Sequence, residues 1–374
     1  MSRWCETHPL PPPGRSERHP RLGLPLSVPA TLLVALVVAL AAAGATGARP
    51  IRSPFLYWGA YVGGGQYGLA DAPWDMQSAR LLEAHAGKGL SLLEWGQSWL
   101  ECAQTRCGLQ PFRADLFERV RSYGAIPVLS WGSAREQHGS DQPAFRLAEI
   151  IRGRYDSFIR RWAEGARRWG RPFFLRFDWE MNIADNAWGE AVNGNAAGEF
   201  VRMWRHVHDI FRQVHATNVT WVWCPNIDFP GQVPLRRLYP GDTYVDWVCL
   251  DGYNWGDESG RPTERWTPFV KVFERSLSEL RAIAPTKPVM IGETASSERG
   301  GSKAAWLADA LRRLPERFPQ VRAIVWFNKN WDGMDWVIET SRAAEAAFAE
   351  AIGSSIYVPN RFARLVRSPI PPPG

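Results

Sequence analysis

Two glutamates stand at the ends of apolar, strand-like segments, where their carboxylates could do chemistry. Glu180 closes the run Phe-Phe-Leu-Arg-Phe-Asp-Trp-Glu that begins at Phe173, and Glu293 closes the run Val-Met-Ile-Gly-Glu that begins at Val289. A carboxylate is costly to bury, so one that stands where a buried strand emerges is usually there for a reaction. Two carboxylates that face each other across a cleft can cleave a glycosidic bond.

The elements that must position these glutamates follow a regular alternation. Strands are expected at 55–62, 91–95, 125–131, 173–179, 219–224, 245–251, 288–292 and 323–327, and helices at 75–86, 114–123, 155–169, 199–215, 267–283 and 303–318. Alternating strands and helices imply parallel pairing, and eight such units over about 300 residues predict a closed (β/α)8 barrel of the α/β class. We assign this single catalytic domain to residues 49–352.

A doubly wound open sheet is the structural alternative. Such a sheet would normally carry a glycine-rich phosphate turn after its first strand. The glycines at 63–65 lack the required spacing and the helix that should follow. The barrel is therefore favoured.

The expected strand ends carry many amides, acids and indoles besides the two glutamates. Indole faces stack on sugar rings, and amides and carboxylates bind hydroxyl groups. Tryptophan also fills protein cores, and core packing explains several of the 20 tryptophans in this chain. It does not explain the polar residues Asn182, Asn226 and Asn328 at the same strand ends. We expect Trp326 first, and then Trp131, to lie near a substrate.

Strand alternation places Arg176, Asp178 and Glu180 on one face. Arg176 would favour ionised carboxylates, whereas a charged Asp178 would favour a protonated Glu180. A general acid needs a raised pKa, so Asp178 acts in the required direction. The alternative is that Glu180 forms a buried structural ion pair with Arg176.

These residues resemble glycoside hydrolase family 26, the β-mannanase-like branch of the retaining clan A glycosidases. The resemblance covers most of residues 55–340. It rests on Tyr-Trp-Gly-Ala-Tyr-Val from Tyr57, Leu-Arg-Phe-Asp-Trp-Glu-Met-Asn from Leu175, Val-Trp-Cys-Pro-Asn from Val222, Val-Asp-Trp from Val245, Asp-Gly-Tyr-Asn from Asp251, and Gly292-Glu293.

The resemblance implies a retaining endo-β-glycosidase that acts by double displacement, with Glu180 as acid/base and Glu293 as nucleophile. It further implies that Tyr253 hydrogen-bonds Glu293 and that no metal or organic cofactor is needed. Trp326 would form the floor beneath the sugar being cleaved. The remaining residues expected to bind substrate are Trp131, Trp179, Asn182, Trp188, Arg176 and Asn226.

Two departures bear on the substrate. Many family members have a histidine immediately before the acid/base, where this chain has Trp179, and the loop after Asn182 has Trp188 as its only indole. We expect β-1,4-mannan as the substrate, with mixed-linkage β-1,3-1,4-glucan or β-1,3-xylan as alternatives. A catalytically inactive carbohydrate-binding barrel is the rival from another class, although the presence of Glu180, Glu293, Tyr253 and Trp326 together weighs against it.

The N-terminal residues 1–48 combine a basic region with an apolar run at 30–43 and a small-residue site, which is typical of a secretory signal peptide. We expect a secreted or extracytoplasmic protein. The alternative is a retained membrane anchor, which would fit a hydrolase attending polysaccharide export. The apolar run is shorter than the roughly 20 residues that span a bilayer, which favours cleavage.

Charge and cysteines complete the expectations. Residues 1–48 carry four Arg and two Glu, and residues 353–374 carry three Arg and no acid, so the net charge of +6 leaves about +1 for the body. A near-neutral body argues against nucleic acid and favours a neutral polysaccharide or oligosaccharide substrate. We expect a monomer, a disulfide between Cys102 and Cys107, and buried thiols at 224 and 249. We also expect an extended C-terminal tail over 353–374, with residues 360–374 mobile.

Overall fold

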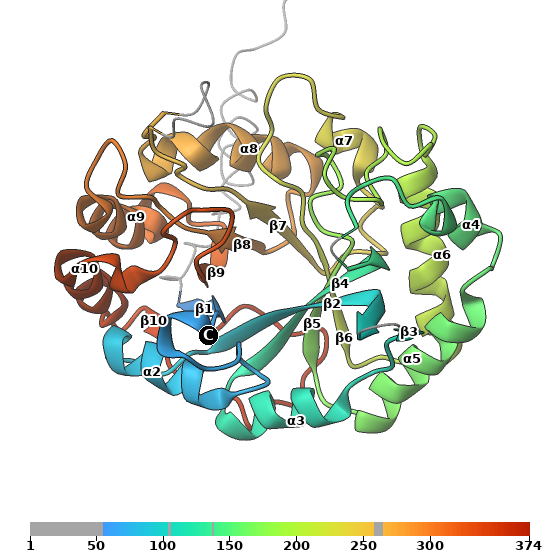
Figure 1. Cartoon of the computed structure of the whole chain (residues 1–374), viewed down its shortest axis with the longest axis horizontal. Helices are drawn as coiled ribbons and strands as arrows, with labels where there is room; N and C mark the ends of the chain where they lie inside the picture. The colour runs from blue at the N-terminus through green and yellow to red at the C-terminus, as the bar shows by residue number, and fades with distance from the viewer. Residues whose placement is uncertain (1–54, 104–105, 137, 258–264) are drawn as a thin grey trace, which may run out of the picture. The chain divides into compact units, whose positions relative to one another are not determined.

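The computed structural model describes residues 55–374 except 104–105, 137 and 258–264 (Figure 1). The expected signal peptide lies outside the described residues. Among the described residues, no helix combines the length and apolar character needed to cross a bilayer.

Eight parallel strands close into a barrel, which confirms the predicted fold. Each strand pairs with its neighbours in chain order, and β1 closes the ring by pairing with both β2 and β9. The barrel strands are β1 (Leu56–Val62), β2 (Leu92–Ala103), β4 (Ile126–Arg135), β5 (Phe173–Phe177), β6 (Val219–Trp223), β7 (Trp247–Asp251), β8 (Val289–Thr294) and β9 (Val321–Asn328).

Helices surround the barrel and cover its outer face (Figure 1). In α6 the buried residues recur at helical spacing, as at Phe200, Met203 and Val207, so one stripe packs on the strands. The helices are α2 (Met76–Ala86), α3 (Ala114–Tyr123), α4 (Leu147–Ile151), α5 (Asp156–Trp169), α6 (Glu199–Gln213), α7 (Leu235–Leu238), α8 (Phe269–Ile283), α9 (Lys303–Arg317) and α10 (Arg342–Ile352).

Two short strands extend the sheet beyond the barrel. The strand β3 (Arg106–Leu109) forms an antiparallel hairpin with the end of β2, and this pairing sets Cys102 opposite Cys107. The predicted disulfide joins these two cysteines. The strand β10 (Tyr357–Val358) pairs with the start of β1.

The apolar interior of the barrel forms a cluster separate from the layer between strands and helices. Tyr57, Phe174, Trp247 and Met290 belong to this inner cluster. Successive side chains on a strand point to opposite faces, so their neighbours Trp58, Phe173 and Ile291 belong to the outer layer.

The expectation of a mobile C-terminal tail is wrong. Residues 353–374 pass behind the ring of strands (Figure 1), and Ile370 is buried in the inner cluster. The Ile370 amide donates to Thr220 Oγ1 at 2.9 Å, and the Trp247 indole donates to the Ile370 carbonyl at 2.8 Å. The proline-rich tail therefore covers the end of the barrel where the strands begin.

Candidate functional site

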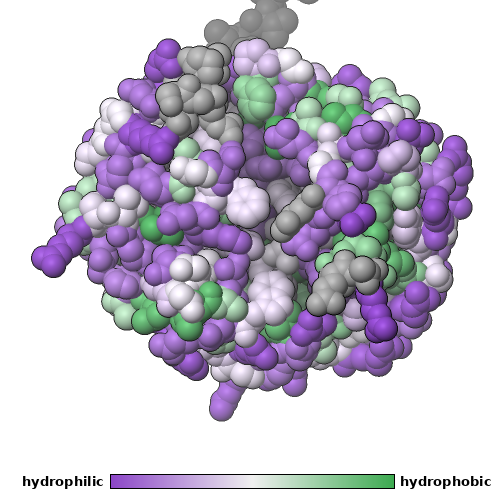
Figure 2. All heavy atoms as spheres, viewed as in Figure 1, coloured by the Kyte–Doolittle hydropathy of each residue, from purple (hydrophilic) through white to green (hydrophobic). Residues whose placement is uncertain are grey.

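A cavity of about 500 Å³ opens where the barrel strands end, and the hollow is visible near the centre of Figure 2. Every barrel strand, or the loop that follows it, contributes to its lining. The lining residues are Tyr61, Gly96, Ser130, Glu136, Trp179, Glu180, Ile183, Asp185, Asn226, Tyr253, Trp255, Glu293, Phe327, Lys329, Trp331, Asp332 and Trp336. Both predicted catalytic glutamates thus face one space.

Glu180 stands on a tight backbone turn just after β5. Asp178 and Glu180 adopt positive φ angles of 45° and 52°, which non-glycine residues rarely do. The turn is held because the Glu180 amide donates to the Cys224 carbonyl at 2.7 Å. Such strain is often found where a side chain must be aimed at a reaction. Here it directs the Glu180 carboxyl into the cavity.

A pair of asparagines holds the carboxyl of Glu180. Asn226 Nδ2 donates to Glu180 Oε1 at 2.7 Å. The Asn226 amide donates to Asn182 Oδ1, and Asn182 Nδ2 donates to the Asn226 carbonyl, both at 2.9 Å. Asn182 therefore fixes the backbone that carries Asn226, and Asn226 contacts the acid directly.

Glu293 lies at the end of β8 with both carboxylate oxygens occupied. Tyr253 Oη donates to Oε2 at 2.5 Å, as the resemblance implied, and Arg176 Nη1 donates to Oε1 at 2.9 Å. The two hydrogen bonds therefore hold the Glu293 carboxylate in position from both sides.

Arg176 is fully buried and holds three carboxylates together. It forms ion pairs with Glu94 and Asp251 as well as with Glu293. Ser130 Oγ adds a hydrogen bond to Glu94 at 2.6 Å. Glu94 and Asp251 lie on different strands, so the sequence alone did not show that both contact Arg176. The proposed ion pair of Arg176 with Glu180 is replaced by these contacts.

Burial of this acidic cluster raises the pKa values of several members. Burial raises the pKa of Glu180 to about 7, and the charge of Glu293 acts in the same direction, against the hydrogen bond from Asn226. Burial likewise raises the pKa of Glu94 to about 7, opposed by Arg176. Glu180 therefore holds a proton at the pH where a general acid is needed.

The expectation that Asp178 raises the pKa of Glu180 is wrong. The positive φ angles break strand alternation, and Asp178 turns away to accept hydrogen bonds from the Ser133 amide at 2.6 Å and Ser133 Oγ at 2.7 Å. Burial raises the pKa of Asp178 itself to about 8. Asp178 therefore holds the turn against β4, whereas burial and the charge of Glu293 raise the pKa of Glu180.

Trp131 and Trp326, the two tryptophans expected first at the substrate, lie outside the cavity. Trp131 is fully buried and its ring stacks on Trp162 of α5, with centroids 4.5 Å apart. Trp326 packs between β9 and the outer helices, where its ring contacts Trp306. On both strands the adjacent residue, Ser130 or Phe327, faces the cavity instead.

Trp179 lines the cavity and Trp188 supports it from behind. The two rings lie 5.0 Å apart, and the Trp188 indole donates to the Trp179 carbonyl at 2.6 Å. A Cβ atom on Gly132 would lie 2.8 Å from Trp188, so only glycine leaves room for this packing. Trp188 is 5% exposed, and its contacts hold in place the Trp179 indole that faces the cavity.

An aromatic wall of Tyr253, Trp255 and Trp336 also lines the cavity, and it was not predicted as a group. Trp336 packs on Tyr253 and Trp255 at centroid distances of 5.1 and 5.0 Å. The Trp326 indole donates to the Trp336 carbonyl at 3.1 Å, so Trp326 acts on the wall through the backbone. Trp336 follows β9 by eight residues, which is too far for a strand-end argument to find.

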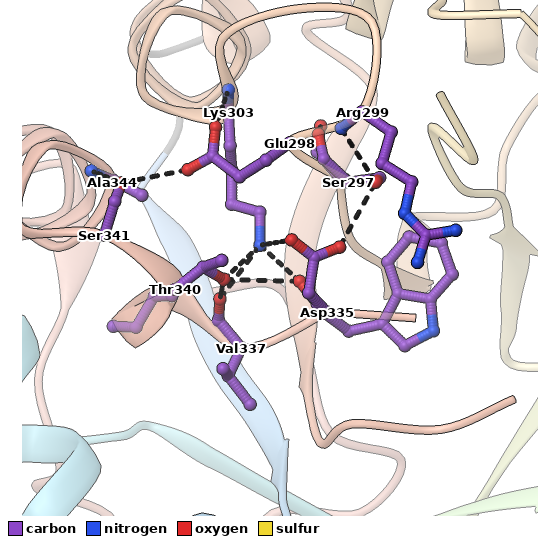
Figure 3. A network of polar contacts seen from close by, with 12 residues as sticks. Ser297, Glu298, Arg299, Lys303, Asp335, Val337, Thr340, Ser341 and Ala344 are labelled. Carbon is purple, nitrogen blue, oxygen red and sulfur yellow. Dashed lines mark hydrogen bonds and ion pairs between the residues drawn. The ribbon is translucent and has the colours of Figure 1, made fainter. Parts of the chain in front are cut away.

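A buried lysine anchors the loop that carries Trp336 (Figure 3). Lys303 Nζ donates to the Val337 carbonyl at 3.0 Å and to Thr340 Oγ1 at 2.5 Å, and it also contacts Asp335. Burial lowers the pKa of Lys303 to about 8. The start of α9 is thereby fastened to the cavity wall.

The expectation of free thiols at positions 224 and 249 is wrong. The neighbouring strands β6 and β7 bring their Cα atoms within 4.2 Å, and a disulfide joins them. A Cβ atom on Gly292 would meet the sulfur of Cys249 at 2.3 Å, so this glycine makes room beside Glu293. Among the described residues, Cys224, Cys249 and Asp251 form the one group with metal-ligand spacing, and the disulfide occupies both sulfur atoms.

A closed parallel barrel with two carboxylates over one cavity is an arrangement found in many glycoside hydrolases. The model of glycosyl hydrolase family 26 matches residues 151–297. This match bears out the resemblance to the family that the sequence motifs indicated.

Three relatives show the extent of the similarity. Endoglucanase H of Acetivibrio thermocellus is 35% identical over 240 residues, which cover 63% of this chain and 25% of that protein. The structure of GH26A from Muricauda sp. is 19% identical over 84% of this chain and 94% of that one, with a TM-score of 0.53. The Bacillus subtilis mannanase BCman is 17% identical over 81% and 87%, with a TM-score of 0.58. The chain spans about a quarter of its curated relative.

Proposed function

We propose that this protein is a retaining endo-β-glycosidase that hydrolyses a neutral β-linked polysaccharide. One observation carries the proposal. Glu180 and Glu293 line the same cavity in opposite environments, since Glu180 is buried with a raised pKa and Glu293 accepts hydrogen bonds from Arg176 and Tyr253. Two carboxyl groups in such different environments can take the two roles that a retaining glycosidase needs, with Glu180 as the general acid and Glu293 as the nucleophile.

In the first step, a Glu293 oxygen attacks the anomeric carbon while Glu180 gives its proton to the departing glycosidic oxygen. The bond to the leaving sugar breaks as the glycosyl–Glu293 ester forms. In the second step, Glu180 takes a proton from water, the water oxygen attacks the anomeric carbon, and Glu293 leaves as a carboxylate. Both glutamates end in their starting states.

The electrostatics of the site suit this exchange of roles. The charge of Glu293 helps to raise the pKa of Glu180, and that charge disappears when Glu293 becomes an ester. The pKa of Glu180 should then fall. Before the first step, the higher pKa keeps on Glu180 the proton that the leaving oxygen needs. In the second step, the lower pKa keeps Glu180 ionised, so that it can accept a proton from water.

For the substrate we propose a β-glucan first and β-mannan second. The relative at 35% identity is named an endoglucanase, whereas the mannanases among the solved structures are below 20% identical and support the fold. The cavity offers Tyr61, Trp179, Trp255 and Trp336 as ring-shaped surfaces for either sugar. β-1,3-Xylan is the third polymer to test.

Reducing-sugar release from barley β-glucan, lichenan, mannan, glucomannan and β-1,3-xylan tests the proposal. Release from one polymer that is lost in Glu293→Ala and kept in Glu316→Ala, an exposed glutamate on α9, would support it. Binding of a polymer with no release would instead favour an inactive carbohydrate-binding barrel.

We also propose that the protein is exported. The apolar run at 30–43 and the two disulfides support this, because disulfides persist mainly in oxidising compartments. N-terminal sequencing of the exported protein tests it. A new N-terminus near residue 49 would indicate cleavage and free secretion, whereas an intact N-terminus in the membrane fraction would indicate an anchor.

A further inference from the structure

The C-terminal tail covers the end of the barrel opposite the cavity. The Phe362 amide donates to the Gly124 carbonyl, just before β4, at 2.8 Å, and Arg322 of β9 donates to the Pro373 carbonyl at 2.8 Å. Between these two points, Ile370 is bonded to β6 and β7. The tail is therefore fastened at several places around the ring of strands, and its outer side forms part of the molecular surface at this end.

The outer side of residues 359–369, which we call the basal strip, is cationic. Arg361, Arg364 and Arg367 are exposed there, and none of them forms an ion pair with an acid among the described residues. Residues 353–374 contain no acid at all. Arginines are common in the last turn of a helix, where they complement the helix dipole. These three follow the end of α10, so the dipole does not explain them.

The basal strip belongs to a separation of charge along the barrel axis. The loop after β5, at the cavity end, carries four acids and no Lys or Arg over residues 178–198. At the opposite end, the tail and the segments that join a helix to the next barrel strand carry six cationic side chains and two acids. These are Lys88, Arg171, Lys287, Arg361, Arg364 and Arg367 against Asp242 and Asp246. A small net charge thus conceals a basic end.

Apolar side chains accompany the arginines of the basal strip. Val366, which lies between Arg364 and Arg367, is 73% exposed, and Phe55, which directly precedes β1 at the same end, is 41% exposed. Exposed apolar groups beside arginines are typical of surfaces that lie in the interfacial region of a membrane, where the guanidinium groups reach the phosphates. Nucleic acid offers phosphates without an apolar layer, so lipid is the better match.

The order of the chain also brings this end of the barrel towards a membrane. The apolar run at 30–43 ends 12 residues before Phe55, which joins β1 where that strand begins. Twelve residues span at most about 40 Å. A run retained in a bilayer would therefore keep the basal strip close to the lipid surface.

We propose that the basal strip binds the anionic headgroups of a phospholipid membrane through its three exposed arginines, with Val366 at the interface. The cavity opens at the other end of the barrel, so the bound protein presents Glu180 and Glu293 away from the lipid. The binding itself does not depend on the proposed function. Only the use of this orientation, which turns the cavity towards a polysaccharide outside the membrane, rests on it.

Cosedimentation of the full-length chain with vesicles tests the proposal. One set of vesicles is phosphatidylcholine alone, and the other is phosphatidylcholine and phosphatidylglycerol in a two-to-one ratio. The combined variant Arg361→Gln, Arg364→Gln and Arg367→Gln should bind the anionic vesicles about 100-fold more weakly, because each arginine near an anionic surface contributes about fivefold. Binding to the neutral vesicles should not change. Circular dichroism would check that the variant is folded.

The matched control removes three exposed arginines from the cavity end of the molecule. Arg106 lies in β3, and Arg202 and Arg342 lie near the starts of α6 and α10. Arg106→Gln, Arg202→Gln and Arg342→Gln together change the net charge by the same amount and leave the basal strip intact. This variant should bind the anionic vesicles within about twofold of the wild type, because charges far from the lipid are screened. High salt should remove the preference of the wild type for phosphatidylglycerol.

The pattern across these samples gives the answer. A preference for phosphatidylglycerol that is lost in the tail variant, kept in the control and removed by salt would support the proposal. Equal losses in both variants would indicate a diffuse effect of net charge, and an undiminished preference in the tail variant would assign the binding to another segment. Either result would overturn the proposal, as would binding to duplex DNA without binding to vesicles. The assay uses no glycosidase activity, so its outcome is independent of the proposed function.

Discussion

Tyr253 Oη lies 2.5 Å from Glu293 Oε2, and the phenol donates the proton in this hydrogen bond. Burial and the surrounding carboxylates raise the pKa of Tyr253, so the phenol keeps its proton throughout the working pH range. Arg176 binds the other oxygen of Glu293. The carboxylate is thus fixed from two sides by donors that do not lose their protons.

Tyr253→Phe should lower kcat far more than it destabilises the fold. The ring would still pack on Trp336, but Glu293 would lose a hydrogen bond that fixes its orientation. We expect a loss of about 10²-fold or more, the size found when one aimed donor is removed from an active site. Steady-state kinetics, with circular dichroism as a check on folding, would measure it. A kcat close to that of the wild type would show that Arg176 alone positions Glu293.

Glu180→Ala should separate substrates by their leaving groups. Natural polymers need a proton on the departing oxygen, whereas activated aryl glycosides need little or none, so the first step should be much slower only for polymers. Matched kcat/KM measurements on both substrate types would test this. Equal losses on the two types would contradict the acid/base assignment.

The pH profile of kcat/KM should fall on the alkaline side as Glu180 loses its proton. Burial raises the pKa of Glu180 to about 7, and the protonated form is the active one, so activity should decline above about pH 7. Asn226→Ala removes a hydrogen bond that lowers this pKa, so the alkaline limb should move to higher pH. A limb that stays in place, or moves to lower pH, would be inconsistent with Glu180 as the titrating acid.

Arg176→Met should destabilise the barrel by about 3 to 5 kcal/mol near neutral pH, because it leaves buried carboxylates without their cation. Without Arg176, the pKa values of Glu94 and Asp251 in the folded state should rise further. These groups would then bind protons more tightly in the folded than in the unfolded state, so stability should fall as pH increases. Urea unfolding at pH 5 and pH 7.5 would measure this, with Arg168→Met on the exposed face of α5 as control. A variant equally stable at both pH values would argue against an uncompensated acidic cluster.

The barrel, and the meeting of Glu180 and Glu293 at one cavity, could be predicted because they depend on local patterns. Glu180, Glu293 and Tyr253 each follow an apolar strand, and parallel strand ends meet at one rim. Trp131 and Trp326 were misplaced because a strand end was treated as facing the cavity whatever its alternation. Ser130, and not its neighbour Trp131, points into the barrel. This becomes clear only from the hydrogen bond between Ser130 and Glu94.

Other features lay beyond strand patterns. The left-handed turn at Asp178 and Glu180 reversed the face on which Asp178 lies, and no glycine marked it. The prolines of the tail indicated an extended segment, but its burial depends on the contact of Ile370 with Thr220, 150 residues away in sequence. Likewise, the disulfide of Cys224 with Cys249 depends on the pairing of β6 with β7.

The most direct measurement is to trap the ester on Glu293. An activated 2-deoxy-2-fluoro glycoside of the preferred sugar slows the second step more than departure of the leaving group, so the covalent intermediate should accumulate. Mass spectrometry of the intact protein should show one added glycosyl unit, and peptide mapping should place it on Glu293, with none in Glu293→Ala. An adduct on another residue, or rapid turnover of natural substrate by Glu293→Ala, would contradict the assignment of Glu293 as the nucleophile.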